Sequence, residues 1–246
     1  MFYGKFTDGK RGKGMSNHLV TEKKGNVFWI RFNRPEKYNA ISSEMYRGLI
    51  AAFDEADSDE DVLITVLTGT GKYYSAGSDF SFAEMEHMRS SDGDALYKIW
   101  VDKIIRHTKC HIGGTDAVQY RLGQSPYLST NELVVALVNG PALGVACTTL
   151  ALCDVVLASD QAYFHCPFTE LGLNPEGASS YTFVNIMGYQ KAVRLALLAE
   201  KMSANELHDA GLVTKVIPHA SFQAETEKFI SNYSKLAHQA SVSIKE

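Results

Sequence analysis

The sequence predicts a single α/β domain, and three observations support this prediction. Apolar, β-prone runs alternate with amphipathic stretches along the chain, which is typical of a sheet with helical crossovers. The 246 residues are enough for one sizeable core. Hydrophobic residues at 45% and charged residues at 21% are ordinary for a globular protein, and no apolar run is long enough to cross a membrane.

The first half of the chain contains one strand, helix, strand unit. Residues 1–18 precede it as a basic, Gly-rich extension without a secretory-type apolar stretch, and we expect this extension to be disordered. Strands are expected over 27–33 (VFWIRFN) and 63–68 (LITVLT). Between them, residues 42–57 have apolar side chains at helical spacing, with Ser42 as the N-cap.

The same order recurs in the second half. A strand over 133–139 leads into a helical stretch over 140–152, and a strand over 154–158 follows. Four more helices are expected after this unit, over 178–187, 190–198, 204–211 and 222–237.

The intervening stretch, 81–130, is less regular. Its helical pattern over 82–88 and 95–105 gives way to a polar sequence without clear periodicity. Loops of this length are uncommon inside compact domains, so we interpret the segment as either a functional loop or a poorly ordered insertion.

Three segments combine strand ends with small residues: 34–41 (RPEKYNAI), 74–80 (YSAGSDF) and 139–147 (NGPALGVAC). Small residues let a ligand approach the main chain, and two facing backbone N–H groups would stabilise the oxygen of a thioester enolate. The alternative is that these glycines only form tight turns. Spacing alone leaves both interpretations open.

Glu176 is the candidate acid-base residue. It follows Pro175 and precedes Gly177 and two serines, which indicates a turn that enters a helix. A Glu there often serves only as a partner of the helix dipole, whereas a catalytic role requires an apolar environment that raises its pKa.

The net charge of −4 provides no basic field for nucleic acid. Neither the cysteines nor the histidines have metal-ligand spacing, so no metal site is expected.

The segments RPEKYNAI, SAGSDF and VNGPALG, in this order, resemble the signatures of the crotonase (enoyl-CoA hydratase/isomerase) superfamily. The resemblance implies a spiral of strand-strand-helix repeats with C-terminal helices over residues 19–246, assembled as a homotrimer or hexamer. It also implies an oxyanion hole made by the backbone N–H groups of Ser78 and Val145. Residues expected to lie along coenzyme A are Lys37, Asn39, Ala40, Ala76 and Gly77.

The positions of the carboxylates within this superfamily indicate which reaction to expect. Hydratases resemble one another in carrying two glutamates, at positions that are Thr148 and Phe168 here. The sequence around Glu176 is instead similar to Δ3,Δ2-enoyl-CoA isomerases of the peroxisomal type. The resemblance therefore implies that Glu176 shifts the double bond of a 3-enoyl-CoA, with acyl-CoA as substrate and no further cofactor. A hydratase or other crotonase-type acyl-CoA enzyme, and a non-catalytic acyl-CoA binding subunit, remain the alternatives.

Two departures from the family pattern accompany this expectation. Residues 107–131 are interpreted as an insertion, and the chain ends earlier than the family usually does, which would remove helices that cover the acyl site. The resemblance suggests a peroxisomal or mitochondrial location, although the chain carries no recognisable targeting signal.

Overall fold

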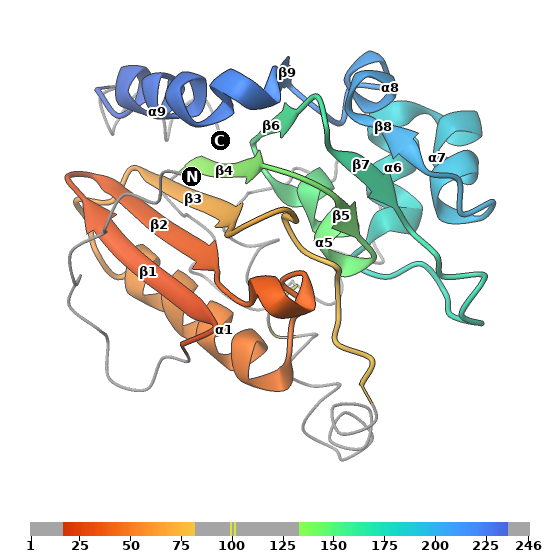
Figure 1. Ribbon diagram of the computed structural model, residues 1–246, viewed down its shortest axis with the longest axis horizontal. Coiled ribbons are helices and arrows are strands. Elements are labelled where there is room, and N and C mark those ends of the chain that lie inside the picture. Colours follow the sequence, from red (N-terminus) through yellow and green to blue (C-terminus); the bar gives the residue numbers. More distant parts are fainter. Residues whose placement is uncertain (1–16, 82–98, 100, 102–132, 236–246) are drawn as a thin grey trace.

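The computed structural model describes residues 17–81, 99, 101 and 133–235 and confirms the α/β class (Figure 1). A six-stranded sheet has the order β1-β2-β3-β4-β6-β9, in which β1 pairs antiparallel with β2 and all other neighbours are parallel. Its strands are β1 Leu19–Lys24, β2 Val27–Phe32, β3 Ile64–Gly69, β4 Leu133–Val138, β6 Val155–Ser159 and β9 Lys215–Ile217. A second sheet contains β5 Ala142–Leu143, β7 Tyr163–His165 and β8 Met202–Ser203.

Strict alternation along the central strands builds a core on each face of the large sheet. In β4, Val134, Ala136 and Val138 belong to the larger core, while Val135 and Leu137 face the smaller one. Helix α1 (Ser43–Asp57) packs into the larger core, and α9 (Phe222–Tyr233) covers the opposite face (Figure 1). The parallel strands are therefore buried on both sides, as their apolar runs predict.

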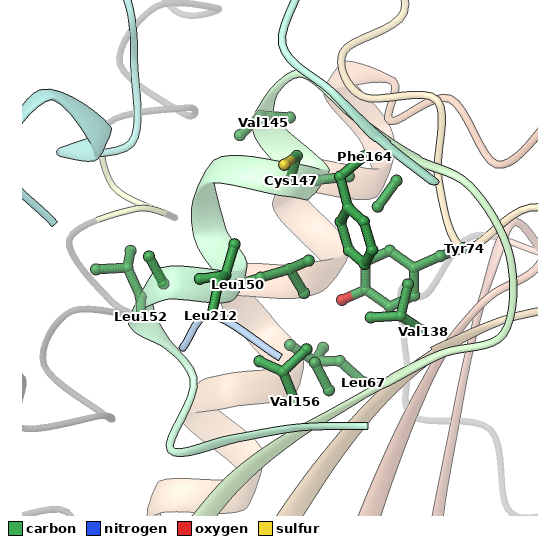
Figure 2. Close-up of a cluster of buried hydrophobic side chains, with 14 of the residues drawn as sticks. Leu67, Tyr74, Val138, Val145, Cys147, Leu150, Leu152, Val156, Phe164 and Leu212 are labelled. Atoms are coloured by element: carbon green, nitrogen blue, oxygen red, sulfur yellow. The ribbon is translucent and has the colours of Figure 1, made fainter. Parts of the chain in front are cut away.

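The remaining helices lie beyond the carboxyl ends of the parallel strands. They are α5 Val145–Thr148, α6 Ser179–Met187, α7 Tyr189–Ala196 and α8 Ala204–Asp209, with short 3₁₀ turns at Pro35–Lys37, Thr149–Leu152 and His219–Ser221. Figure 2 shows Val145 and Cys147 of α5 in one buried cluster with Phe164 of β7. None of the helices within the described ranges is long and apolar enough to cross a membrane.

Most predicted elements are confirmed, and Ser42 caps α1 by accepting a hydrogen bond from the amide of Met45 (3.3 Å). The continuous helical stretch over 140–152 is wrong: the chain forms β5, then α5, then a 3₁₀ turn. The reason is local, because Gly144 has φ +54°, ψ −126° and starts α5 only after the chain has paired with β7. The expectations for 1–16, 82–98, 102–132 and 236–246 fall outside the described residues.

Gly140 is expected to tolerate no side chain. A Cβ there would overlap the backbone carbonyl of Lys72, and neither group can move easily. We therefore expect Gly140→Ala to lower the free energy of unfolding by more than about 2 kcal/mol, as overpacking does, measured by urea denaturation. Gly25→Ala is the control, because Gly25 has φ +61° but a Cβ there would meet nothing within 4 Å. The free energy of unfolding should therefore fall only by the ~1 kcal/mol that the left-handed conformation costs a residue with a side chain. Equal losses would contradict the steric argument.

Candidate active site

Two segments far apart in the sequence run side by side beyond the carboxyl ends of the central strands β3 and β4. Ser75 forms a parallel β-bridge with Ala142, and the amide of Leu143 donates to the carbonyl of Ser75 (3.0 Å). Three residues further along each segment stand Ser78 and Val145. The register of the bridge thus brings the two predicted oxyanion-hole residues to equivalent positions on neighbouring segments.

A glycine precedes each of these two residues, and both glycines have positive φ. The values are +83° for Gly77 and +54° for Gly144. A Cβ on Gly77 would lie 2.6 Å from the carbonyl oxygen of Leu143 and 3.6 Å from the Cα of Gly144. The close approach of the two segments therefore requires glycine at position 77 for space as well as for conformation.

The peptide groups before Ser78 and Val145 are oriented by their own carbonyl oxygens. The carbonyl of Gly77 accepts from the amide of Ile41 (2.8 Å), so the amide of Ser78, on the other side of a trans peptide, points away from Ile41. Val145 is the first residue of α5, where an amide has no partner within the helix. Neither amide donates to a backbone acceptor in the described part of the chain.

Glu176 lies in the turn that leads into α6. Its side chain is half-buried, and its backbone carbonyl accepts from both the amide (3.1 Å) and the hydroxyl (2.6 Å) of Ser179. The next residue, Gly177, has φ +64°, and a Cβ there would lie 2.5 Å from Oγ1 of Thr148. The turn that carries Glu176 is thus packed directly against α5, the helix that begins at Val145.

The charge of Glu176 acts on two buried groups. Burial raises the pKa of the Tyr46 hydroxyl well above its usual value, the hydrogen bond with Ser78 offsets part of this effect, and the Glu176 carboxylate raises the pKa further. The Cys147 thiol and burial raise the pKa of Cys166, with a smaller contribution from Glu176. Glu176 is thus electrostatically coupled to both Tyr46 and Cys166.

Sequence reasoning missed Tyr46. Its hydroxyl lies 2.7 Å from Oγ of Ser78, and both side chains are buried. A signal was available, because Tyr46 falls on the apolar face of the predicted helix over 42–57, and a buried tyrosine hydroxyl normally requires a polar partner.

The expected CoA-binding residues differ in how far they are exposed. Lys37 is exposed, while Ala40 and Ala76 are half-buried and Gly77 is buried. Asn39 is completely buried, and its side-chain amide donates to the carbonyls of Thr70 (2.9 Å) and Tyr73 (2.8 Å). The same amide lies 3.3 Å from the carbonyl of Tyr74, so the side chain of Asn39 connects the first signature segment with the second.

Arg34 and Asp79 form an ion pair between the same two segments. Nη1 of Arg34 lies 2.5 Å from Oδ2 of Asp79 and 3.2 Å from the carbonyl of Ala40. The other carboxylate oxygen of Asp79 accepts from the amide of Ser81 (2.9 Å). Asp79 therefore braces the turn after Ser78.

The hydratase positions carry no acid-base group here. Thr148 and Phe168 are both buried, and the hydroxyl of Thr148 donates to the carbonyl of Val145 (3.2 Å). Glu170 is 61% exposed and lies 4.0 Å from His165. Among residues 17–81 and 133–235, no three His, Cys, Asp or Glu side chains gather as metal ligands would. The absence of a metal site stays a prediction.

An α/β fold that brings Ser78 and Val145 to equivalent positions on neighbouring segments, with Glu176 on a turn packed against α5, has the arrangement of an enzyme that polarises a carbonyl group. The chain belongs to the enoyl-CoA hydratase/isomerase family, whose sequence profile matches residues 22–110 and 116–246. The crotonase resemblance is thereby confirmed.

Isomerases are among the similar relatives. Enoyl-CoA delta isomerase 3, peroxisomal, from Mus musculus is 39% identical and is covered over 68% of its length by 94% of this chain. Enoyl-CoA delta isomerase 2 from Rattus norvegicus is 37% identical over 93% of this chain. The chain spans about half of that relative, 53% of its length.

Solved structures confirm the fold. An enoyl-CoA hydratase from Mycobacterium avium subsp. paratuberculosis superposes with a TM-score of 0.77 at 28% identity, over 94% of this chain and 83% of the other. An enoyl-CoA hydratase/isomerase from Pseudoalteromonas atlantica gives a TM-score of 0.77 at 28% identity, over 93% and 81%.

The ion pair of Asp79 predicts how stability depends on pH. Burial alone would raise the pKa of Asp79, but the hydrogen bonds from Arg34 and Ser81 outweigh it and the pKa is lowered. A lowered folded-state pKa contributes stability above the unfolded value of about 4 and loses it as pH falls through the folded value. We expect Asp79→Asn to cost about 1.5–3 kcal/mol at pH 7, measured by urea denaturation.

Urea denaturation of the same variant at several pH values tests whether the charge of Asp79 is the cause. The difference in unfolding free energy between the parent and Asp79→Asn should shrink as pH falls below about 4, where the parent carboxylate becomes protonated. Asp61→Asn is the control, since the Asp61 carboxylate is 90% exposed and 3.9 Å from Lys23. A difference that is constant from pH 7 to pH 3 would contradict the role of the charge.

Proposed function

We propose that this chain is a Δ3,Δ2-enoyl-CoA isomerase that converts 3-enoyl-CoA into trans-2-enoyl-CoA. The observation that carries the proposal is the position of Glu176, on a turn packed against the helix that begins at Val145. Its carboxylate also raises the pKa of the Tyr46 hydroxyl. The similarity to enoyl-CoA delta isomerases from mouse and rat supports it.

In the proposed mechanism, the thioester oxygen accepts hydrogen bonds from the amides of Ser78 and Val145. These bonds stabilise the negative charge that forms on this oxygen when a proton leaves C2. The Glu176 carboxylate takes that proton, and the C3–C4 double bond shifts as the dienolate forms. The same carboxyl group then returns a proton to C4, which leaves the conjugated product and regenerates the carboxylate.

One acid-base group is sufficient for this reaction, whereas water addition needs groups that activate water and protonate carbon. Thr148 and Phe168 cannot exchange protons in this way. An enoyl-CoA hydratase remains the second candidate, because a short-chain-enoyl-CoA hydratase from Clostridium acetobutylicum is 31% identical over 93% of this chain.

The acyl-CoA is proposed to lie along the first two signature segments. The exposed ammonium group of Lys37 would contact phosphate, and the backbone near Ala40 and Ala76 would contact the rest of the coenzyme. The buried side chain of Asn39 would contribute by holding these segments together. The reaction requires no cofactor other than this substrate.

Location and assembly are proposed from the family. A mouse relative is named peroxisomal and a Dictyostelium discoideum relative mitochondrial, which supports one of these compartments. A homotrimer or hexamer is the proposed assembly, and sedimentation of the full chain would test it.

Replacing the proposed base should stop turnover. We expect Glu176→Gln to lower kcat by about 10²- to 10⁴-fold, the usual contribution of acid-base catalysis, because the amide accepts no proton. Conversion of 3-enoyl-CoA is followed by the absorbance of the conjugated thioester, and binding of a saturated acyl-CoA is measured by calorimetry. Binding should change little.

Glu170→Gln is the matched control, since it makes the same change in an exposed side chain of the same segment. It should retain parental activity. Near-parental activity in Glu176→Gln would refute the assignment of the base. A parent that hydrates trans-2-enoyl-CoA faster than it isomerises 3-enoyl-CoA would favour the hydratase, and a parent that binds acyl-CoA without either reaction would favour a binding subunit.

A single carboxyl group that shuttles one proton should transfer label within the substrate. With 3-enoyl-CoA deuterated at C2, we expect part of the deuterium to appear at C4 of the product, measured by NMR after a single turnover in H₂O. A product that carries no deuterium at C4, with full exchange into solvent, would indicate separate groups for the two proton transfers.

A further inference from the structure

The hydroxyl of Tyr46 is placed in the core without an obvious structural need. Tyr46 is 2% exposed and its ring packs with the apolar residues of α1 in the larger core. A phenylalanine would fill the same space without a polar atom. The hydroxyl instead meets Oγ of Ser78 at 2.7 Å, so a tyrosine from α1 and a serine from the candidate oxyanion hole satisfy each other inside the protein.

The residue that supplies the first amide is fixed from several directions by one short stretch of chain. The amide of Ile41 donates to the carbonyl of Gly77 (2.8 Å), and the amide of Asp79 donates to the carbonyl of Ile41 (2.9 Å). These bonds hold the residues on either side of Ser78. Tyr46, five residues after Ile41 on the helix that follows, holds the side chain of Ser78 itself.

The same hydroxyl also lies within the electrostatic reach of the proposed base. The carboxylate of Glu176 raises the pKa of Tyr46, after the larger effects of burial and the Ser78 hydrogen bond. Tyr46 therefore stays protonated at neutral pH and keeps its hydrogen bond with Ser78.

We propose that Tyr46 is a positioning residue for the reaction, which acts through Oγ of Ser78 to hold the Ser78 amide in line with the thioester oxygen. The kinetic part of this inference rests on the proposed isomerase function. The structural part requires only that the two amides polarise the carbonyl of a bound CoA thioester. A shift of a few tenths of an ångström in the Ser78 peptide weakens the hydrogen bond where charge develops.

The test is Tyr46→Phe, which removes one oxygen atom and keeps the ring. Loss of an oxyanion-hole donor typically costs about 10²- to 10³-fold in rate. A donor that is present but misaligned should lower the rate by a smaller factor. We expect kcat to fall about tenfold with KM changed less than about twofold. The infrared carbonyl stretch of bound butyryl-CoA, which reports polarisation without turnover, should shift back toward its value in water.

Two further variants separate positioning from a loss of stability. Thr226→Val removes another buried hydroxyl, one that donates to Phe222 on α9 (2.7 Å), and should lower stability without changing kcat or the carbonyl stretch. Ser78→Ala breaks the same contact from the other side. Because Tyr46 acts through Oγ of Ser78, Tyr46→Phe should add little further loss in the Ser78→Ala background.

The outcomes are distinguishable. Loss of kcat and of carbonyl polarisation in Tyr46→Phe, absent in Thr226→Val, supports the proposal. Unchanged polarisation, or additive effects of Tyr46→Phe and Ser78→Ala, overturns it. If the parent polarises butyryl-CoA but does not isomerise 3-enoyl-CoA, the proposed function fails, and the infrared comparison alone decides the role of Tyr46.

Discussion

The site depends on one constraint, the parallel contact between the segments 74–78 and 141–145. Its register, set by the bridge from Ser75 to Ala142, determines that Ser78 and Val145 stand at equivalent positions. A shift by one residue would place a glycine opposite one of them and turn the wrong peptide toward the site. The absence of a side chain on Gly77 permits the approach, because a Cβ would lie 2.6 Å from the carbonyl of Leu143.

The segment RPEKYNAI supports this contact from outside. The side chain of Asn39 binds the carbonyls of Thr70 and Tyr73, and Arg34 pairs with Asp79 on the far side of Ser78. These polar side chains are therefore largely occupied within the protein. Asn39 and Arg34 belong to the sequence signature because they hold the second segment in place. The exposed part of the first segment, such as Lys37, stays accessible to a ligand.

Sequence alone predicts the elements whose signal is local and periodic. The apolar run of β4, Leu133–Val138, and the cap at Ser42 are of this kind. It does not predict β5, β7 and β8, which have two or three residues each and exist only because they pair with one another. The apolar face of the helix over 42–57 indicates that Tyr46 is buried, but it does not identify the partner of its hydroxyl, because Ser78 stands 32 residues away.

The electrostatics of the site explain why a single carboxyl group would carry the proton. Burial holds the pKa of Tyr46 well above neutrality, and the neighbouring thiol and burial do the same for Cys166, so both stay protonated. Thr148 and Phe168 cannot titrate in this range. Glu176 is thus the remaining acid-base group among these described residues, and one such group is sufficient for the proposed isomerisation.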